Sequence, residues 1–226
     1  LHRRERKSME GRRRFLKQGL GVLVGATAVR ATGPDLLHAQ ESSPDYVMII
    51  DINKCTGCES CVIACKARNK TAPGHFLTRV NTVETGTYPH PVMHFAPVQC
   101  NQCEDPPCVA ACPEQATYKL ATGIVFTDWN RCKGAGDCVP ACPYGARFLD
   151  SRYGRKSDKC DFCLDRLERG FSPSCVENCP TGARLFGDRN RPSGAFAEII
   201  RRLDLLPAKP ELQMKTRVLY VPVRRG

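Results

Sequence analysis

The chain has 226 residues, with 34 Lys and Arg against 23 Asp and Glu, a formal net charge of +11 and fifteen cysteines. Its length allows one domain or two small ones. A basic balance of this size is typical of nucleic-acid-binding proteins, but residues 1–39 alone hold nine Lys and Arg against three acidic residues, and no nucleic-acid-binding motif follows. The cysteines fall in four short groups, which indicates metal ligands rather than disulfides, because closely spaced cysteines on one loop suit a shared metal.

Residues 1–39 are predicted to be a twin-arginine signal peptide. The stretch Arg12–Lys17, RRRFLK, precedes a short apolar run that ends at Ala26. A positive region, a short apolar run and a cleavage site after Ala39 describe a secretory signal rather than a membrane helix, which needs about 20 apolar residues. Since this route exports proteins already folded around cofactors, we expect the protein in the periplasm or at the outer face of the cytoplasmic membrane. A basic helical tail is the alternative.

The first cysteine group follows an expected strand at residues 46–51. Its spacing, C-x2-C-x2-C-x3-C, is that of bacterial ferredoxins, and it consists of Cys55, Cys58, Cys61 and Cys65. Three thiolates on one small loop hold three corners of an iron–sulfur cubane, whereas zinc usually takes two pairs of ligands from separate loops. The last gap is one helical turn, so it carries Cys65 toward a second cluster.

The second and third groups are predicted to form one double-cluster unit. Strands and loops are expected over residues 66–99, and a hairpin over residues 116–128 joins the second group to the third, as in small ferredoxins. The fourth cysteine of each run then serves the other cluster. The predicted second cluster takes Cys100, Cys103, Cys108 and Cys142, and the predicted third takes Cys132, Cys138 and Cys112.

The third group lacks one ligand, because Ala135 stands where the ferredoxin spacing requires a cysteine. A [3Fe–4S] cluster held by the three remaining thiolates is the preferred interpretation. It would be the easiest of the four clusters to reduce, since loss of a thiolate removes one negative charge. A four-iron cluster with water or the carboxylate of Asp137 on its fourth iron is one alternative, and an empty site is the other.

The fourth group follows an expected hairpin at residues 147–155 and contains an eleven-residue gap, Leu164–Ser174, predicted to include a helical excursion. By elimination, the first and fourth groups form a second unit. The predicted first cluster takes Cys55, Cys58, Cys61 and Cys179, and the predicted fourth takes Cys160, Cys163, Cys175 and Cys65. Residues 40–226 are therefore predicted to be one α+β domain, built from two interleaved bacterial-ferredoxin-like double-cluster units with hairpin insertions.

Two elements are expected near the end of the chain. Residues 195–206 have apolar residues at helical spacing, and residues 218–221 read as a strand. The amphipathic helix is expected to pack against the cluster core rather than a membrane. With no membrane span of its own, the mature protein should reach the membrane only through a partner.

Four cysteine groups, the Cys-Pro ends at Pro113, Pro143 and Pro180, and the run Lys159–Cys163, KCDFC, resemble a known family over residues 45–225. These are the four-cluster ferredoxin-like subunits of molybdopterin oxidoreductase complexes, which include those of tetrathionate, thiosulfate, polysulfide and dimethyl sulfoxide reductases and of formate-dependent nitrite reduction. The resemblance implies a non-catalytic subunit that relays single electrons between a polytopic quinol-reactive membrane subunit and a molybdopterin catalytic subunit. A related subgroup, the electron subunits of nitrate reductases, holds a three-iron cluster where the same cysteine is replaced.

A sulfur-compound reductase is the preferred setting, with nitrite-reduction and sulfite-reductase-linked membrane complexes as alternatives. A freely diffusing periplasmic ferredoxin and an iron–sulfur protein with a structural or sensing role are the other interpretations. The sequence carries no nucleophile with a positioned base and no glycine-rich nucleotide loop in a strand–helix context. We therefore expect an electron carrier and not a catalytic subunit.

Overall fold

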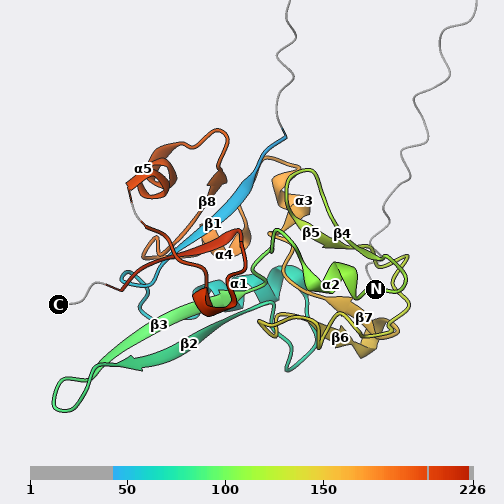
Figure 1. Ribbon diagram of the computed structural model, residues 1–226, viewed down its shortest axis with the longest axis horizontal. Coiled ribbons are helices and arrows are strands. Elements are labelled where there is room, and N and C mark those ends of the chain that lie inside the picture. Colours follow the sequence, from blue (N-terminus) through green and yellow to red (C-terminus); the bar gives the residue numbers. More distant parts are fainter. Residues whose placement is uncertain (1–42, 203, 224–226) are drawn as a thin grey trace, which may run out of the picture. The chain divides into compact units, whose positions relative to one another are not determined.

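A three-stranded sheet in the order β8-β1-β9 joins the first described strand to the last (Figure 1). The computed structural model describes residues 43–202 and 204–223, so the predicted signal at residues 1–39 lies outside the described residues. Strand β1 is Tyr46–Asp51, β8 is Arg184–Asp188 and β9 is Val218–Val221. β1 pairs antiparallel with β8 and parallel with β9. The strands predicted at residues 46–51 and 218–221 are confirmed with the same bounds.

The two faces of this sheet contact different parts of the protein, because successive residues of a strand point to opposite faces. Met48 and Ile50 belong to the core that includes cysteines of the first, second and fourth groups. Val47 and Ile49 pack against Phe196 of helix α5, Gly194–Arg202. The predicted amphipathic helix is thus confirmed, although it is shorter than expected. It packs on the sheet face that points away from the cysteines, rather than directly against them.

Helix α1, Ser60–Asn69, begins inside the first cysteine group and leads to a long hairpin of β2, Thr78–Thr85, and β3, Val92–Gln99. The strands pair along their whole length, from Thr78 opposite Gln99 to Thr85 opposite Val92. Figure 1 shows the hairpin extending well beyond the neighbouring elements. The strands and loops expected within residues 66–99 are present after residue 69, whereas helix α1 occupies the start of that range.

Two shorter hairpins flank the third cysteine group. The first pairs β4, Thr117–Lys119, with β5, Val125–Thr127, as predicted. The second pairs β6, Phe148–Asp150, with β7, Lys156–Asp158, through a 3-10 turn at Ser151–Tyr153. Its second strand lies wholly beyond the predicted range of residues 147–155, so only the first strand and the turn fall where they were predicted. The side chain of Asp150 accepts a hydrogen bond from the backbone N–H of Arg152 at 3.0 Å, so it caps the 3-10 turn and delays the return strand.

The remaining elements are single turns: α2 at Pro107–Ala110, α3 at Leu164–Leu167, α4 at Ser174–Glu177 and a 3-10 turn at Pro210–Leu212. The helical excursion predicted within Leu164–Ser174 is present only as α3, after which the chain continues as a loop. The fold is a mixture of short helices and small sheets, as the predicted α+β class requires. No helix in the described residues is long and apolar enough to cross a membrane.

Candidate metal centres

All fifteen cysteines are free, as expected for metal ligands. Cys58 is exposed, Cys55, Cys112, Cys142 and Cys179 are half-buried, and the other ten cysteines are buried. Within residues 43–202 and 204–223, no three His, Cys, Asp or Glu side chains are grouped as they would be around a single metal ion. The donors that the four groups offer are thiols, which are the ligands of iron–sulfur clusters.

The first and fourth groups lie together, although the whole of the second and third groups separates them in sequence. Burial raises the pKa of the Cys55 thiol, and nearby Cys61 and Cys179 raise it further. Burial also raises the pKa of Cys65 to about 12, with Cys175 and Cys163 adding to the rise. Cys179 therefore lies with the first group and Cys65 with the fourth. These are the neighbours that the predicted ligand sets require, while the ligand assignments stay predictions.

The second and third groups are also neighbours. Burial, together with the nearby thiols of Cys100, Cys108 and Cys142, raises the pKa of Cys103 to about 12. One cavity is lined by Ala135, by Asp137 and by all three cysteines predicted for the third cluster, Cys112, Cys132 and Cys138. The structure thus brings together the thiols, the substituted position and the carboxylate on which the alternatives for this site depend.

A buried arginine, Arg184, lies between the first and fourth groups. It opens strand β8, and only 2% of its surface is exposed. Its Nη2 donates to Thr78 Oγ1 at 2.7 Å, and its Nη1 donates to Gln99 Oε1 at 3.1 Å and to Cys175 Sγ at 3.7 Å. Burial disfavours its charged form, but Cys175 and Cys61 outweigh this, so its pKa is raised. We call Arg184 and the cysteines of the first and fourth groups the Arg184 site.

A second buried arginine, Arg147, lies between the second and third groups, and 5% of its surface is exposed. Its Nη1 donates to Ser157 Oγ at 3.1 Å and to Thr127 Oγ1 at 3.3 Å. Burial disfavours its charged form, but Cys108 and Cys138 outweigh this, so its pKa is raised as well. We call Arg147 and the cysteines of the second and third groups the Arg147 site.

A short repeat places both arginines, and the sequence analysis missed it. The third group ends in CPYGAR, residues 142–147, and the fourth in CPTGAR, residues 179–184. In both, the glycine has a positive φ, 60° at Gly145 and 63° at Gly182, and its N–H bonds back to the carbonyl of the last cysteine. Glycine adopts this conformation without steric cost. The shared turn directs the fifth residue after the cysteine into the interior. The repeat could therefore have predicted that the two arginines occupy equivalent positions.

Both sites fit negatively charged clusters. A buried guanidinium is costly unless an anion compensates it, yet among the described residues neither arginine forms an ion pair with a carboxylate, and their polar partners are the hydroxyl, amide and sulfur atoms given above. Nε of Arg184 and Nε and Nη2 of Arg147 are buried without a hydrogen-bond partner in the described part of the chain. The groups that face these cations are thiols. Thiolate-bound iron–sulfur clusters would supply the missing negative charge and the sulfur acceptors.

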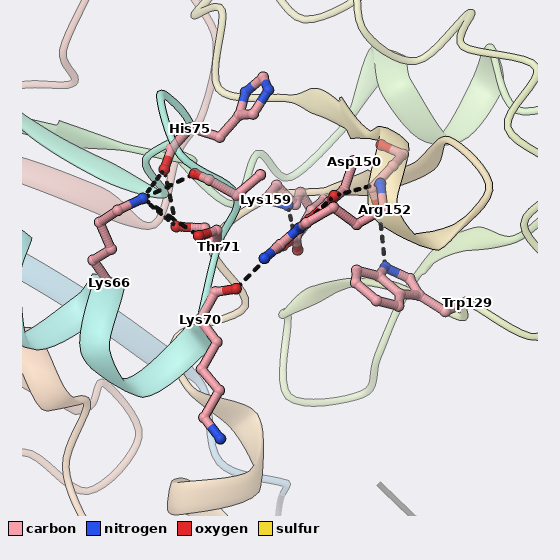
Figure 2. Close-up of polar contacts among 11 residues, drawn as sticks. Lys66, Lys70, Thr71, His75, Trp129, Asp150, Arg152 and Lys159 are labelled. Carbon is pink, nitrogen blue, oxygen red and sulfur yellow. Dashed lines mark hydrogen bonds and ion pairs between the residues drawn. The ribbon is translucent and has the colours of Figure 1, made fainter. Parts of the chain in front are cut away.

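The segment that follows helix α1 connects the two sites. Figure 2 shows Lys66 turned back onto this segment, where its Nζ donates to the carbonyls of Thr71 and His75, the latter at 3.0 Å. Arg152, from the turn between β6 and β7, donates to the carbonyl of Lys70 at 2.9 Å. The His75 ring also stacks on Phe148, with ring centroids 4.4 Å apart. The end of the first cysteine group is thereby fixed to the hairpin that follows the third.

Comparison with known proteins also indicates iron–sulfur ligation. A family model described as a 4Fe-4S dicluster domain matches residues 91–189. The B subunit of tetrathionate reductase from Salmonella typhimurium is 41% identical over 220 residues, which cover 93% of this chain and 87% of that protein. This protein belongs to the iron–sulfur electron-transfer subunits of oxidoreductase complexes.

Other members of this family are similar over most of their length. The B subunit of sulfite dehydrogenase from Allochromatium vinosum is 39% identical, over 79% of this chain and 83% of that protein. The B component of polysulfide reductase from Wolinella succinogenes is 38% identical, over 80% of this chain and 96% of that protein. The resemblance inferred from the cysteine spacing and the Cys-Pro ends is therefore confirmed at the level of the family.

Proposed function

We propose that this protein is the exported electron-transfer subunit of a respiratory sulfur-compound reductase, relaying single electrons between a quinol-reactive membrane subunit and a molybdopterin catalytic subunit. The observation that carries the proposal is a set of fifteen free cysteines, several of which lie beside two buried arginines that have no carboxylate partner in the described residues. Bound iron–sulfur clusters supply one-electron transfer, and the protein's own part is to hold, shield and charge-compensate them. Similarity to tetrathionate, sulfite and polysulfide enzymes supports the sulfur-compound setting.

A relay must exchange electrons with two partners, so two of its cluster sites have to approach the surface. Cys58 in the first predicted set is exposed, and Ala135 beside the third predicted set is exposed as well. All four cysteines of the fourth predicted set are buried. This pattern supports electron exchange with partners at the first and third sets and internal transfer through the fourth.

We propose three [4Fe–4S] clusters and one [3Fe–4S] cluster, held by the four predicted cysteine sets. The third set has three thiols around its cavity, and Ala135 offers no ligand there. Asp137 also lines the cavity, so it is the competing fourth ligand. The proposed composition corresponds to about fifteen irons per chain, against about sixteen for four cubanes.

Iron analysis of anaerobically purified protein, together with EPR of the oxidised sample, tests this composition. We expect about fifteen irons per chain and a three-iron signal. Ala135→Cys restores the ferredoxin spacing, so it should add about one iron and abolish that signal. Asp137→Ala is the matched control and should change neither. About sixteen irons without a three-iron signal in the wild type, lowered by Asp137→Ala, would identify Asp137 as the fourth ligand.

Cell fractionation tests the proposed export. Replacing Arg12 and Arg13 by lysine keeps the positive charge but removes the twin-arginine pair, so the variant should stay in the cytoplasm with its clusters assembled. Its export at the wild-type level would contradict the proposal.

Purification of the native complex tests the proposed partners. A molybdopterin subunit and a polytopic membrane subunit should co-purify, and the complex should reduce tetrathionate, thiosulfate or polysulfide. Recovery of the protein as a lone monomer would instead indicate a diffusible carrier.

A further inference from the structure

We propose that Arg147 and Arg184 raise the reduction potentials of the clusters. Each places one fixed positive charge between two clusters and raises the reduction potential of both. The proposal rests on the clusters of the proposed function and adds to it a way in which this chain sets their potentials. It follows from the place of the two side chains in the fold, between cysteine groups that are distant in sequence.

The charge of Arg184 is held in place by neutral groups. Thr78, Gln99 and Met48 surround the guanidinium with oxygen and sulfur acceptors, at 2.7 Å for Thr78 Oγ1, 3.1 Å for Gln99 Oε1 and 3.6 Å for Met48 Sδ. None of these side chains neutralises it. Cys175 Sγ lies 3.7 Å from Nη1. The positive charge therefore remains available to the sulfur ligands that it faces.

Arg147 reaches its clusters differently, through a hydroxyl. Ser157 Oγ lies 3.1 Å from Nη1 of Arg147 and 3.2 Å from Cys138 Sγ, so it connects the guanidinium to a predicted ligand of the third cluster. On the other side, Cys108, a predicted ligand of the second cluster, packs in one buried hydrophobic cluster with Cys138. Arg147 thus acts toward both predicted clusters of its pair.

A nearby cation stabilises the reduced form of a cluster more than the oxidised form, because reduction adds one negative charge. The effect is large where the charge is removed from water, and cluster potentials depend on net charge and on hydrogen bonds to the sulfurs. Loss of one guanidinium should therefore lower the potentials of its own pair of clusters and leave the other pair almost unchanged. This locality separates a change in charge from a general weakening of the fold.

The experiment is a redox titration of the whole purified protein, followed by EPR, on Arg147→Gln and Arg184→Gln. The three-iron signal reports the third cluster, and the signals of the reduced four-iron clusters report the other three. We expect Arg147→Gln to change the ratio of oxidised to reduced third cluster by about tenfold at a fixed potential, equivalent to about 59 mV for one electron. Arg184→Gln should leave that signal in place and shift two four-iron clusters.

The lysine variants are the matched controls, because Arg147→Lys and Arg184→Lys keep the charge and should retain most of the wild-type potential. Equal shifts in all four clusters, or a Gln variant with normal iron content and wild-type potentials, would overturn the proposal. If the wild type binds no iron, the proposed function itself fails, which is a different result.

A second measurement needs no variant, in case the Gln variants do not assemble. Pulsed EPR on wild-type protein labelled with ¹⁵N in arginine should detect nitrogen coupling to the reduced clusters at the Arg184 site, where Nη1 lies against Cys175 Sγ. Absence of any arginine nitrogen coupling in cluster-loaded protein would contradict the inferred position of the charge.

Discussion

Arg184 is the first residue of β8 in a three-stranded sheet, whereas Arg147 forms hydrogen bonds with two separate two-stranded hairpins. The Arg184 site shares a large core that includes Met48, Ile50 and Phe162, all fully buried. A separate core at the Arg147 site has three buried members, Cys108, Val125 and Cys138, while Cys100 belongs to the larger core. The same six-residue repeat therefore places a guanidinium beside two hydrophobic cores of very different size.

This difference shows that one part of the sequence determines the position of the guanidinium charge, and other parts determine the groups that surround it. The repeat determines where the arginine points, since both copies share the turn with a glycine at positive φ. Long-range packing determines what the guanidinium meets. Arg184 contacts a thiol directly, beside the hydroxyl of Thr78, whereas Arg147 donates to two hydroxyls. Cluster pairs that share a motif can accordingly differ in solvation and hydrogen bonding, which are two of the properties that set their potentials.

The largest expected effect tests the predicted fourth ligand set, which is buried throughout. Cys160→Ser should abolish the fourth cluster and remove about four irons per chain, because the buried serine replaces a thiolate in a site that water cannot complete. Cys58→Ser, at the exposed edge of the first set, is the matched control and should cost less iron. Iron analysis and EPR check both. An unchanged iron content in Cys160→Ser would refute that ligand assignment.

The next effect concerns the size of the core at the Arg184 site. Phe162 is fully buried and meets the Phe186 ring edge-on at 5.2 Å. Phe162→Ala should lower the free energy of unfolding by about 3 to 5 kcal/mol. Tyr153→Ala, near the Arg147 site, removes a ring that is 49% exposed, so it should cost about 1 kcal/mol or less. Anaerobic denaturant titration measures both, and equal losses would remove the contrast between the two cores.

A smaller effect on stability is expected at the turn between β6 and β7, which connects the Arg147 site to the Arg184 site. Asp150 is buried and pairs with Arg152 at 2.6 Å, and the hydrogen bond from Arg152 lowers the pKa of Asp150 below its ordinary value. For a carboxylate with a lowered pKa, the stabilisation is complete above the unfolded pKa of about 4 and is lost as the pH falls through the folded pKa. Asp150→Asn should be less stable than wild type at pH 7, and this difference should shrink on acidification. Parallel stability curves for the two proteins would refute this role.

The smallest effect probes the hydroxyl at the Arg147 site. Ser157→Ala should destabilise the protein by about 1 kcal/mol and lower the potential of the third cluster by less than Arg147→Gln does, since the guanidinium remains. Thr78→Val is the matched change at the Arg184 site and should leave the third cluster unaffected. EPR-monitored titration of the three-iron signal distinguishes them. A shift in Thr78→Val as large as in Ser157→Ala would show that the sites are not electrically separate.

Sequence reasoning succeeded where the signal is local. The strands at residues 46–51 and 218–221 are short apolar runs, and the cysteine groups with their Cys-Pro ends and the KCDFC run led to the correct family. It was less accurate at the second hairpin, where Asp150 caps a turn that strand patterns do not reveal. Helix α5 ends earlier than its apolar pattern suggested.

The buried arginines show a different limit. CPYGAR and CPTGAR can be read in the sequence, but their importance depends on what surrounds the last residue. Arg184 meets Thr78 and Gln99 from the β2–β3 hairpin as well as Cys175. Since arginine is ordinarily exposed, only the tertiary packing shows that these two side chains are enclosed.

The strand order β8-β1-β9 has a consequence for the order of events during synthesis. The central strand leaves the ribosome before either of its neighbours, which follow all four cysteine groups in the sequence. Contacts between such distant segments form late. All fifteen cysteines are consequently synthesised before either edge strand can pair with β1, so the sheet is completed only after the last predicted cluster ligand has been made.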